Sequence, residues 1–153
     1  MLSALNQARK ALRTNDVPVG AAAVYQGKII ARGCNAKEAS GDPLAHAELI
    51  CLRRAVRTVG FRLLGDVTFY VTLEPCAMCA GALVLARMGR LVYGTADPKA
   101  GAAGSVMNIA HHPRLNHRMP IATGILEDEC RDILKTFFKK LRLQKSMRPL
   151  KRT

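Results

Sequence analysis

Residues 67–88 read VTFYVTLEPCAMCAGALVLARM, a β-branched and aromatic run followed by an apolar run that contains two cysteines. The first part, VTFYVTL, favours a buried strand, and we expect it to be the central strand of a sheet. The second part runs on as an apolar helix, in which Met78 and the leucines and valine of GALVLARM are expected to belong to the core. The stretch therefore predicts a strand that leads directly into a helix, with Cys76 and Cys79 near the start of that helix.

Cys76 and Cys79, three residues apart on a helix, project to the same side of it. Thiolates and a neutral imidazole are preferred protein ligands of zinc. Upstream, LAHAELICLRRAV has the period of a helix buried on one face, and His46 near its start would complete a His–Cys–Cys set. Three protein ligands leave the fourth position to water, whose pKa zinc lowers. Glu48 is a carboxylate that can take a proton from such a water, so the pattern favours a catalytic zinc site.

The same residues are also compatible with three roles that involve no catalytic zinc. A structural zinc site could take Cys34, Cys51, Cys130 or a distant histidine as its fourth ligand. The cysteine pair could instead be a redox dithiol, although the preceding proline and the lack of a thioredoxin-like context weaken this interpretation. A lone histidine at the start of an apolar helix could also be an ordinary core residue.

Periodicity and turn residues predict the rest of the fold. The expected elements are a helix over residues 2–12, a hairpin over 18–35, strands over 90–96 and 119–126, and a closing helix over 127–145. Residues 97–117, rich in Gly, Ala, His and Pro, are expected to form a functional loop with a short helical piece. This order indicates a five-stranded sheet with helices on both faces, an α/β sandwich, in one domain over residues 1–153.

The net charge of +13 is spread unevenly along the chain. Residues 131–153 contain nine Lys or Arg and one acid, so this basic C-terminal helix and tail predicts a polyanionic partner, or else a solvated helix face. Five cysteines suit a reducing cytosol. No stretch has the length and apolarity of a membrane span, and the N-terminal residues lack the apolar core of a secretion signal. We therefore expect a cytoplasmic protein without membrane contact.

The chain resembles the bacterial tRNA-specific adenosine deaminases over almost its whole length. The motifs that carry the resemblance are DVPVGA, GCN, DPLAHAE, YVTLEPCAMCAGA, DPKAGAAGS, HHPRLNHR, GILEDEC and FFKKLR. The combination H-x-E with P-C-x-x-C is shared by the zinc nucleobase deaminases in general, whereas the later motifs are specific to the tRNA enzymes. The resemblance implies a cytidine-deaminase-like fold with three α/β/α layers and a five-stranded mixed sheet. It also implies one Zn²⁺ per subunit and a homodimer whose RNA grooves involve both chains.

The implied activity is hydrolytic deamination of the wobble adenosine of a tRNA anticodon, that of an arginine tRNA above all, to inosine. His46, Cys76 and Cys79 would be the zinc ligands, and Glu48 the catalytic proton carrier. The implied contacts with the anticodon stem-loop are Asn35, Asp97, Lys99, His112, Asn116 and Phe138.

Several of these implied RNA contacts could instead have a purely structural role. Asn35 could be a turn residue, and Asp97 and Lys99 could be solvated charges of a turn. Packing or capping would account for His112 and Asn116 equally well. Since adjacent aromatic residues on a helix point in different directions, we expect at least one of the two phenylalanines at 137 and 138 to belong to the core.

Three positions depart from the family pattern: Ala96, Ala100 and Asn108 stand where an arginine, a threonine and an acid are common. These departures concern contacts with RNA rather than the chemistry. Two other functions stay open: a deaminase of a free base or nucleotide, of the guanine, cytosine or deoxycytidylate type, and a non-catalytic zinc module that binds RNA.

Overall fold

The computed structural model describes residues 1–146, and the remainder of the predicted basic tail, 147–153, lies outside the described residues. Five strands form one sheet with the order β2-β1-β3-β4-β5. The strands are β1 (Gly20–Tyr25), β2 (Lys28–Cys34), β3 (Thr68–Leu73), β4 (Arg90–Thr95) and β5 (Ile121–Thr123). β1 pairs antiparallel with β2 and β3, whereas β3, β4 and β5 run parallel, so the sheet is mixed as expected.

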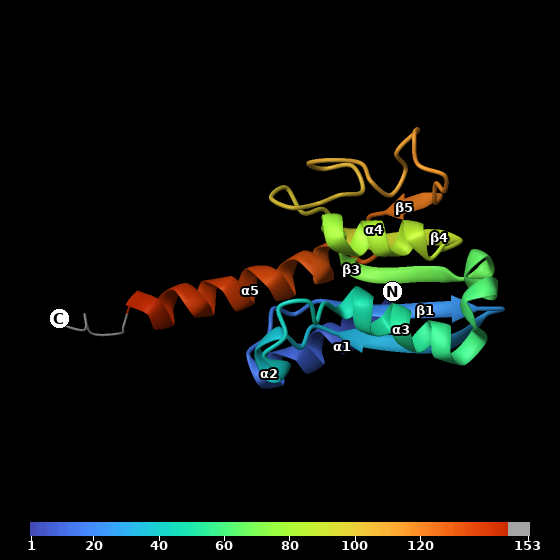
Figure 1. Ribbon diagram of the computed structural model, residues 1–153. Helices are drawn as coiled ribbons and strands as arrows, with labels where there is room; N and C mark the ends of the chain where they lie inside the picture. The colour runs from blue at the N-terminus through green and yellow to red at the C-terminus, as the bar shows by residue number, and fades with distance from the viewer. Residues whose placement is uncertain (147–153) are drawn as a thin grey trace.

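Helices cover both faces of this sheet (Figure 1). The α-helices are α1 (Leu2–Ala11), α2 (Lys37–Ser40), α3 (Ala47–Val59), α4 (Ala77–Leu85) and α5 (Glu127–Ser146), with short 3-10 helices η1 (Leu12–Thr14) and η2 (Phe61–Asp66). α3 and α4 lie on one face, and α1 and the first turns of α5 lie on the other. The last turns of α5 extend beyond the sheet (Figure 1). The three-layer α/β/α prediction is therefore confirmed.

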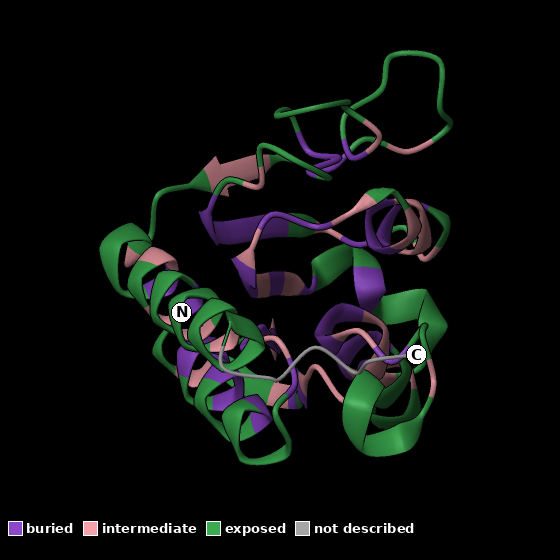
Figure 2. Cartoon of the chain, turned by 90° about the vertical axis from the view of Figure 1, so that its left-hand side faces the viewer, coloured by how far each residue is buried: buried purple, intermediate pink, exposed green. Residues whose placement is uncertain are grey.

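Glycines let the helices lie close against the strands. A Cβ atom at Gly20 would collide with the backbone of Ala4 and Ala8 in α1, and a Cβ at Gly33 would collide with the backbone of α3. The core is built from the apolar faces of these layers, with Phe69 of β3 among its largest fully buried side chains. Figure 2 shows the buried residues concentrated in the sheet and in the helix faces against it. VTFYVTL is thus the central strand that its composition predicts.

The loop between β4 and β5 corrects one prediction. The short helical piece expected within residues 97–117 is absent, since this described segment contains only turns and isolated bridges. Some of its backbone N–H groups bond to distant partners instead: Ala102 donates to the Pro75 carbonyl at 2.8 Å, and Ala103 to the Glu74 carboxylate at 2.9 Å. Glycine and alanine composition alone did not reveal these long-range partners.

Within residues 1–146, no helix combines the length and the apolar character needed to cross a lipid bilayer. The sequence-based expectation of no membrane span agrees with this finding.

Candidate active site

The candidate site lies at one end of the sheet, where three connections meet. β3 ends at Leu73, two residues before Pro75 and three before Cys76, and the neighbouring parallel strand β4 ends at Thr95. β2 runs antiparallel to β1, so its last residue, Cys34, lies beside Gly20 at the same end. The backbone N–H of Asn35 then donates to the Val19 carbonyl at 3.0 Å. Loop residues from distant parts of the chain are therefore gathered at this edge.

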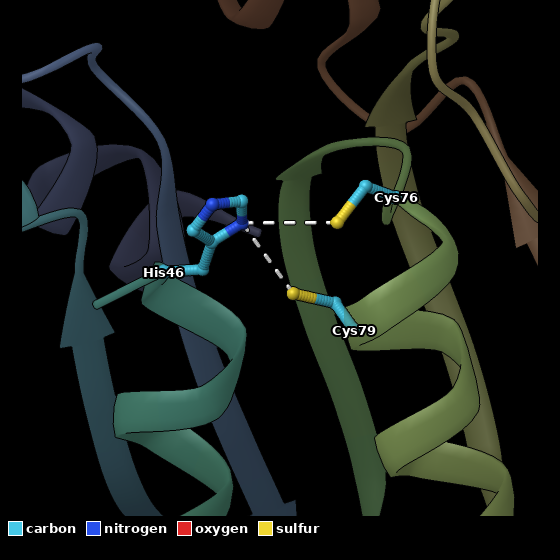
Figure 3. A group of neighbouring side chains, drawn as sticks. All are labelled: His46, Cys76 and Cys79. Atoms are coloured by element: carbon cyan, nitrogen blue, oxygen red, sulfur yellow. Dashed lines mark hydrogen bonds between the residues drawn. The ribbon is translucent and has the colours of Figure 1, made fainter. Parts of the chain in front are cut away.

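His46, Cys76 and Cys79 come together at the starts of two helices (Figure 3). His46 is the residue before α3 and Cys76 the residue before α4, while Cys79 lies in the first turn of α4. The His46 Nδ1 atom is 3.8 Å from the Cys76 Sγ and 3.6 Å from the Cys79 Sγ. The predicted ligands thus converge although His46 and Cys76 lie thirty residues apart in the sequence.

These three residues fit a zinc ion. Zinc bonds of about 2.3 Å to sulfur and 2.0 Å to nitrogen place tetrahedral ligand atoms about 3.6 Å apart, close to the spacing found here. Hydrogen bonds from the Cys79 thiol and the His46 ring lower the pKa of the Cys76 thiol to about 3, which favours the thiolate that binds metal. Within residues 1–146, the ligand atoms of Cys34, Cys51 and Cys130 do not belong to this group. Among the described residues, neither a third cysteine nor a second histidine joins the group as the fourth ligand that a structural zinc site would need.

Glu48 lies in the first turn of α3, next to the metal-ligating group. Its side chain is only 4% exposed, and among the described residues no group donates a hydrogen bond to its Oε2 atom. Burial raises the pKa of this carboxyl to about 7. A buried oxygen without a protein partner is costly unless a ligand or reactant meets it. This observation favours a catalytic role for Glu48 over a structural one.

Asn35 links the end of β2 to the start of α3. Its Oδ1 atom accepts a hydrogen bond of 2.8 Å from the backbone N–H of Ala47, the residue after His46. No described residue accepts a hydrogen bond from the Asn35 Nδ2 group, and Asn35 lines the same groove as His46 and Glu48. The side chain therefore fixes the start of α3 and leaves an amide donor for a bound molecule.

Two buried acids were missed by the sequence analysis. Asp16 is fully buried and accepts hydrogen bonds from the backbone N–H groups of Glu38 at 2.6 Å and Ala39 at 3.3 Å, so it caps α2 from a distant loop. Glu74 is 2% exposed and accepts hydrogen bonds from residues 97–105. The only sequence signal for Glu74 was a charged residue placed directly after a strand expected to be buried.

Asp97 and Lys99 lie in the loop that follows β4, at the rim of the groove. The Asp97 Oδ1 atom accepts hydrogen bonds from the backbone N–H groups of Lys99 at 2.9 Å and Ala100 at 3.3 Å. The two residues thus form the turn that the sequence left open as an alternative to RNA contact. Both nevertheless line the groove with His46 and Glu48, so the turn presents the Lys99 side chain at the site's entrance.

The groove has a volume of about 1850 Å³ and runs from the metal-ligating group to α5. Phe137 and Phe138 both line it, with their rings edge to face and 5.4 Å apart. Phe138 is 40% exposed and Phe137 is half-buried, so neither belongs to the core and the expectation that at least one would is wrong. The physical reason is that this part of α5 has passed the edge of the sheet. Five basic α5 residues line the groove: Arg131, which is ion-paired with Glu127 and Asp128, and Lys135, Lys140, Arg142 and Lys145.

His112 and Asn116 are not brought to the groove of their own chain. Both are exposed in the loop between β4 and β5. The Nδ1 atom of His112 accepts a hydrogen bond of 3.2 Å from the backbone N–H of Arg114, which is a local turn contact. The structure therefore gives these two residues a position on the loop surface rather than in the site.

A His–Cys–Cys group beside a buried glutamate, at the helix starts of this five-stranded sheet, defines a deaminase of the cytidine-deaminase-like superfamily. Residues 1–142 match the family model of the MafB19-like deaminases. The tRNA-specific adenosine deaminase of Bacillus subtilis strain 168 is 43% identical over 95% of this chain and 90% of its own length. The Haemophilus influenzae enzyme of the same name is 43% identical over 96% of this chain and 86% of its own. The chain belongs to the family of tRNA-specific adenosine deaminases.

Solved structures agree with this assignment. One from a study of A-to-I editing by tRNA deaminases at the wobble position of transfer RNA superposes with a TM-score of 0.83 at 41% identity, over 88% of this chain and 97% of that chain. A guanine deaminase from Nitrosomonas europaea superposes with a TM-score of 0.73 at 22% identity, over 88% of this chain and 80% of that chain. The second likeness concerns the fold alone.

Proposed function

We propose that this enzyme hydrolyses adenosine to inosine at the wobble position of a tRNA anticodon, with an arginine tRNA as its first substrate and one Zn²⁺ per subunit. The single observation that carries the proposal is Glu48, a buried carboxyl beside three residues able to bind zinc, with one oxygen that has no hydrogen-bond partner among residues 1–146. That carboxyl faces a groove large enough for a nucleoside together with the nucleotides beside it in the RNA. We further propose that residues 1–153 form a single domain and that the enzyme acts in the cytoplasm.

Glu48 supplies the proton transfers in this reaction. When bound to His46, Cys76 and Cys79, zinc would supply the Lewis acidity that makes water nucleophilic near neutral pH. Glu48 accepts one proton from the attacking water and delivers it to the purine N1; it then carries the second proton of that water, from the hydroxyl added at C6, to the departing amino group. One water is consumed, and inosine and ammonia are the products. Burial of Glu48 keeps bulk solvent out of this exchange.

Asn35 and the groove wall bind and orient the nucleoside in this proposal. The free Nδ2 amide of Asn35 donates to the purine or ribose, while its Oδ1 holds the start of α3. Phe138 offers an exposed ring for base stacking, and Lys99 offers a charge to a phosphate. His112 and Asn116 lie outside the groove of their own chain, so their proposed contacts with RNA require the groove of a partner subunit.

The substrate assay tests the function directly. Purified enzyme is expected to convert adenosine to inosine in an arginine-tRNA anticodon stem-loop and to leave free adenosine, guanine and cytosine unchanged. The target base must be splayed from its stack, which costs least in a single-stranded loop. Turnover of only the free bases or nucleosides would contradict the RNA assignment and favour the small-molecule deaminase.

Salt should weaken the binding of the stem-loop. Four basic α5 residues other than the ion-paired Arg131 line the groove, and neutralising four phosphates would lower the affinity about 50-fold between about 50 and 200 mM salt. Fluorescence anisotropy of a labelled stem-loop measures this slope. An affinity that does not change with salt would show that the basic face of α5 is solvated rather than bound to RNA.

A second copy of the chain is the proposed partner for the exposed face of α4. The residues on this face are small or apolar: Ala77, Met78, Gly81, Ala82 and Leu85. Leu85 is 84% exposed, which corrects the expectation that the leucines of this helix belong to the core. Apolar helix faces of this kind are typical of interfaces between subunits.

Replacing Leu85 with glutamate is expected to shift the enzyme from dimer to monomer, because a charge would be buried in the interface. The matched control is Leu2→Glu, at an α1 leucine that is 68% exposed, which should leave the mass of the dimer in solution unchanged. Analytical ultracentrifugation measures the mass of both variants. A dimer that survives Leu85→Glu would place the interface elsewhere.

A further inference from the structure

Glu74 is a buried carboxylate for which the reaction described above has no use. Its side chain is 2% exposed, and it lies between β3 and the zinc-ligating Cys76. Within residues 1–146, both ion pairs belong to Arg131, so no cation balances the charge of Glu74. Burying an uncompensated carboxylate is expensive unless hydrogen bonds satisfy it.

The loop over residues 97–105 provides those hydrogen bonds. The Glu74 Oε1 atom accepts from the backbone N–H groups of Ala103 at 2.9 Å and Ser105 at 3.0 Å. Its Oε2 atom accepts from the backbone N–H of Asp97 at 3.0 Å and from the Ser105 hydroxyl. One carboxylate therefore holds both ends of this loop.

The same loop is also bound to the backbone around Glu74. The N–H of Ala102 donates to the Pro75 carbonyl at 2.8 Å, and Gly101 forms a β-bridge with Cys76. Gly101 packs so closely on the Glu74 carboxylate that a Cβ atom would collide with it. The loop and the segment that carries a metal ligand thus behave as one unit.

The other side of this loop lines the groove. Asp97, Pro98, Lys99 and Ala100 border the same cavity as His46 and Glu48. A change in the anchoring of residues 97–105 would therefore move one wall of the groove relative to the reacting atoms.

We propose that Glu74 is a positioning residue that fixes residues 97–105 as the wall against which the RNA nucleotides beside the target adenosine bind. The inference rests on the proposed function and deepens it. Glu74 acts on the affinity for RNA through the loop, whereas the zinc ligands and Glu48 act on the chemical step.

Glu74→Gln tests the proposal because it keeps the size of the side chain and replaces one acceptor oxygen with an NH₂ donor. The amides of residues 97–105 are expected to exchange with deuterium about tenfold faster, because one pair of hydrogen bonds is lost. The KM for an anticodon stem-loop should rise about tenfold while kcat stays within about threefold. Zinc content should not change. Ser105→Ala, which removes one donor, should shift exchange and KM in the same direction but less.

Asp66→Asn is the matched control, since it removes the same charge at an exposed residue at the end of η2. It should change neither the amide exchange of residues 97–105 nor the KM for the stem-loop. Faster exchange with an unchanged KM would mean that Glu74 only stabilises the fold, and unchanged exchange would mean that it does not hold the loop. Either result overturns the proposal. If Glu74→Gln does not fold, Ser105→Ala decides the question by the same two readouts. A wild-type enzyme inactive on the stem-loop would refute the proposed function separately, since loop exchange and the Kd of the stem-loop remain measurable.

Discussion

Glu48→Gln is expected to lower the rate of stem-loop deamination about a thousandfold or more while zinc content and RNA affinity stay within about twofold of wild type. Glutamine has the size of glutamate but can neither accept the proton of the attacking water nor return it to the leaving group. The buried Oε2 of Glu48 has no described protein partner, so the substitution disrupts no hydrogen bond to that atom. Single-turnover kinetics on labelled stem-loop at several enzyme concentrations give the rate and the RNA affinity, and metal analysis of the same sample gives the zinc content.

The control for Glu48→Gln is Glu127→Gln in the first turn of α5. This exposed carboxylate pairs with Arg131 at 3.2 Å on the surface, where an ion pair contributes little to stability, so activity should be unchanged. A Glu48→Gln variant with full deamination activity would remove Glu48 from the mechanism. A wild-type enzyme that binds stem-loop and never deaminates it would favour the non-catalytic zinc module.

Cys79→Ser is expected to abolish both zinc binding and activity. Loss of a residue that only hydrogen-bonds to a metal ligand already lowers the metal affinity roughly 10–100-fold. Removal of a thiolate ligand itself should lower it further. Cys79 is fully buried in the first turn of α4, so no other described cysteine can replace it without moving the helix. Metal analysis after gel filtration and deamination of the stem-loop are the two measurements.

Cys34→Ser is the matched control because Cys34 is a half-buried free thiol outside the metal-ligating group. It should keep one zinc per chain and full activity. Zinc retained by Cys79→Ser, or lost by Cys34→Ser, would contradict the His–Cys–Cys assignment.

Much of the fold could be predicted because the responsible signals are local. VTFYVTL and the hairpin before it show β-branched runs bounded by turn residues, and α3 and α5 show the helical period, so their types follow from neighbouring residues alone. Cys76 and Cys79 were predictable for a similar reason, since a Cys-x-x-Cys pair at a helix start is itself a local pattern, and His46 was predictable from the separate local motif HAE. The structure adds the distances that bring His46 to that pair.

Tertiary structure alone decided the rest of the site. Neither the burial of Glu48 nor the lack of a partner for its Oε2 can be seen in HAE, because both depend on what the sheet and α4 place around it. The loop after β4 has no helix since Glu74 and Pro75 bind its backbone groups across the sheet edge. Leu85 and at least one of Phe137 and Phe138 were expected in the core from helical position, yet their helices leave those faces uncovered by this chain. The sequence by itself thus determined the elements and the zinc ligands, which depend on local spacing. The groove, its wall and the exposed faces depend on contacts between distant residues, which leave no periodic signal in the chain.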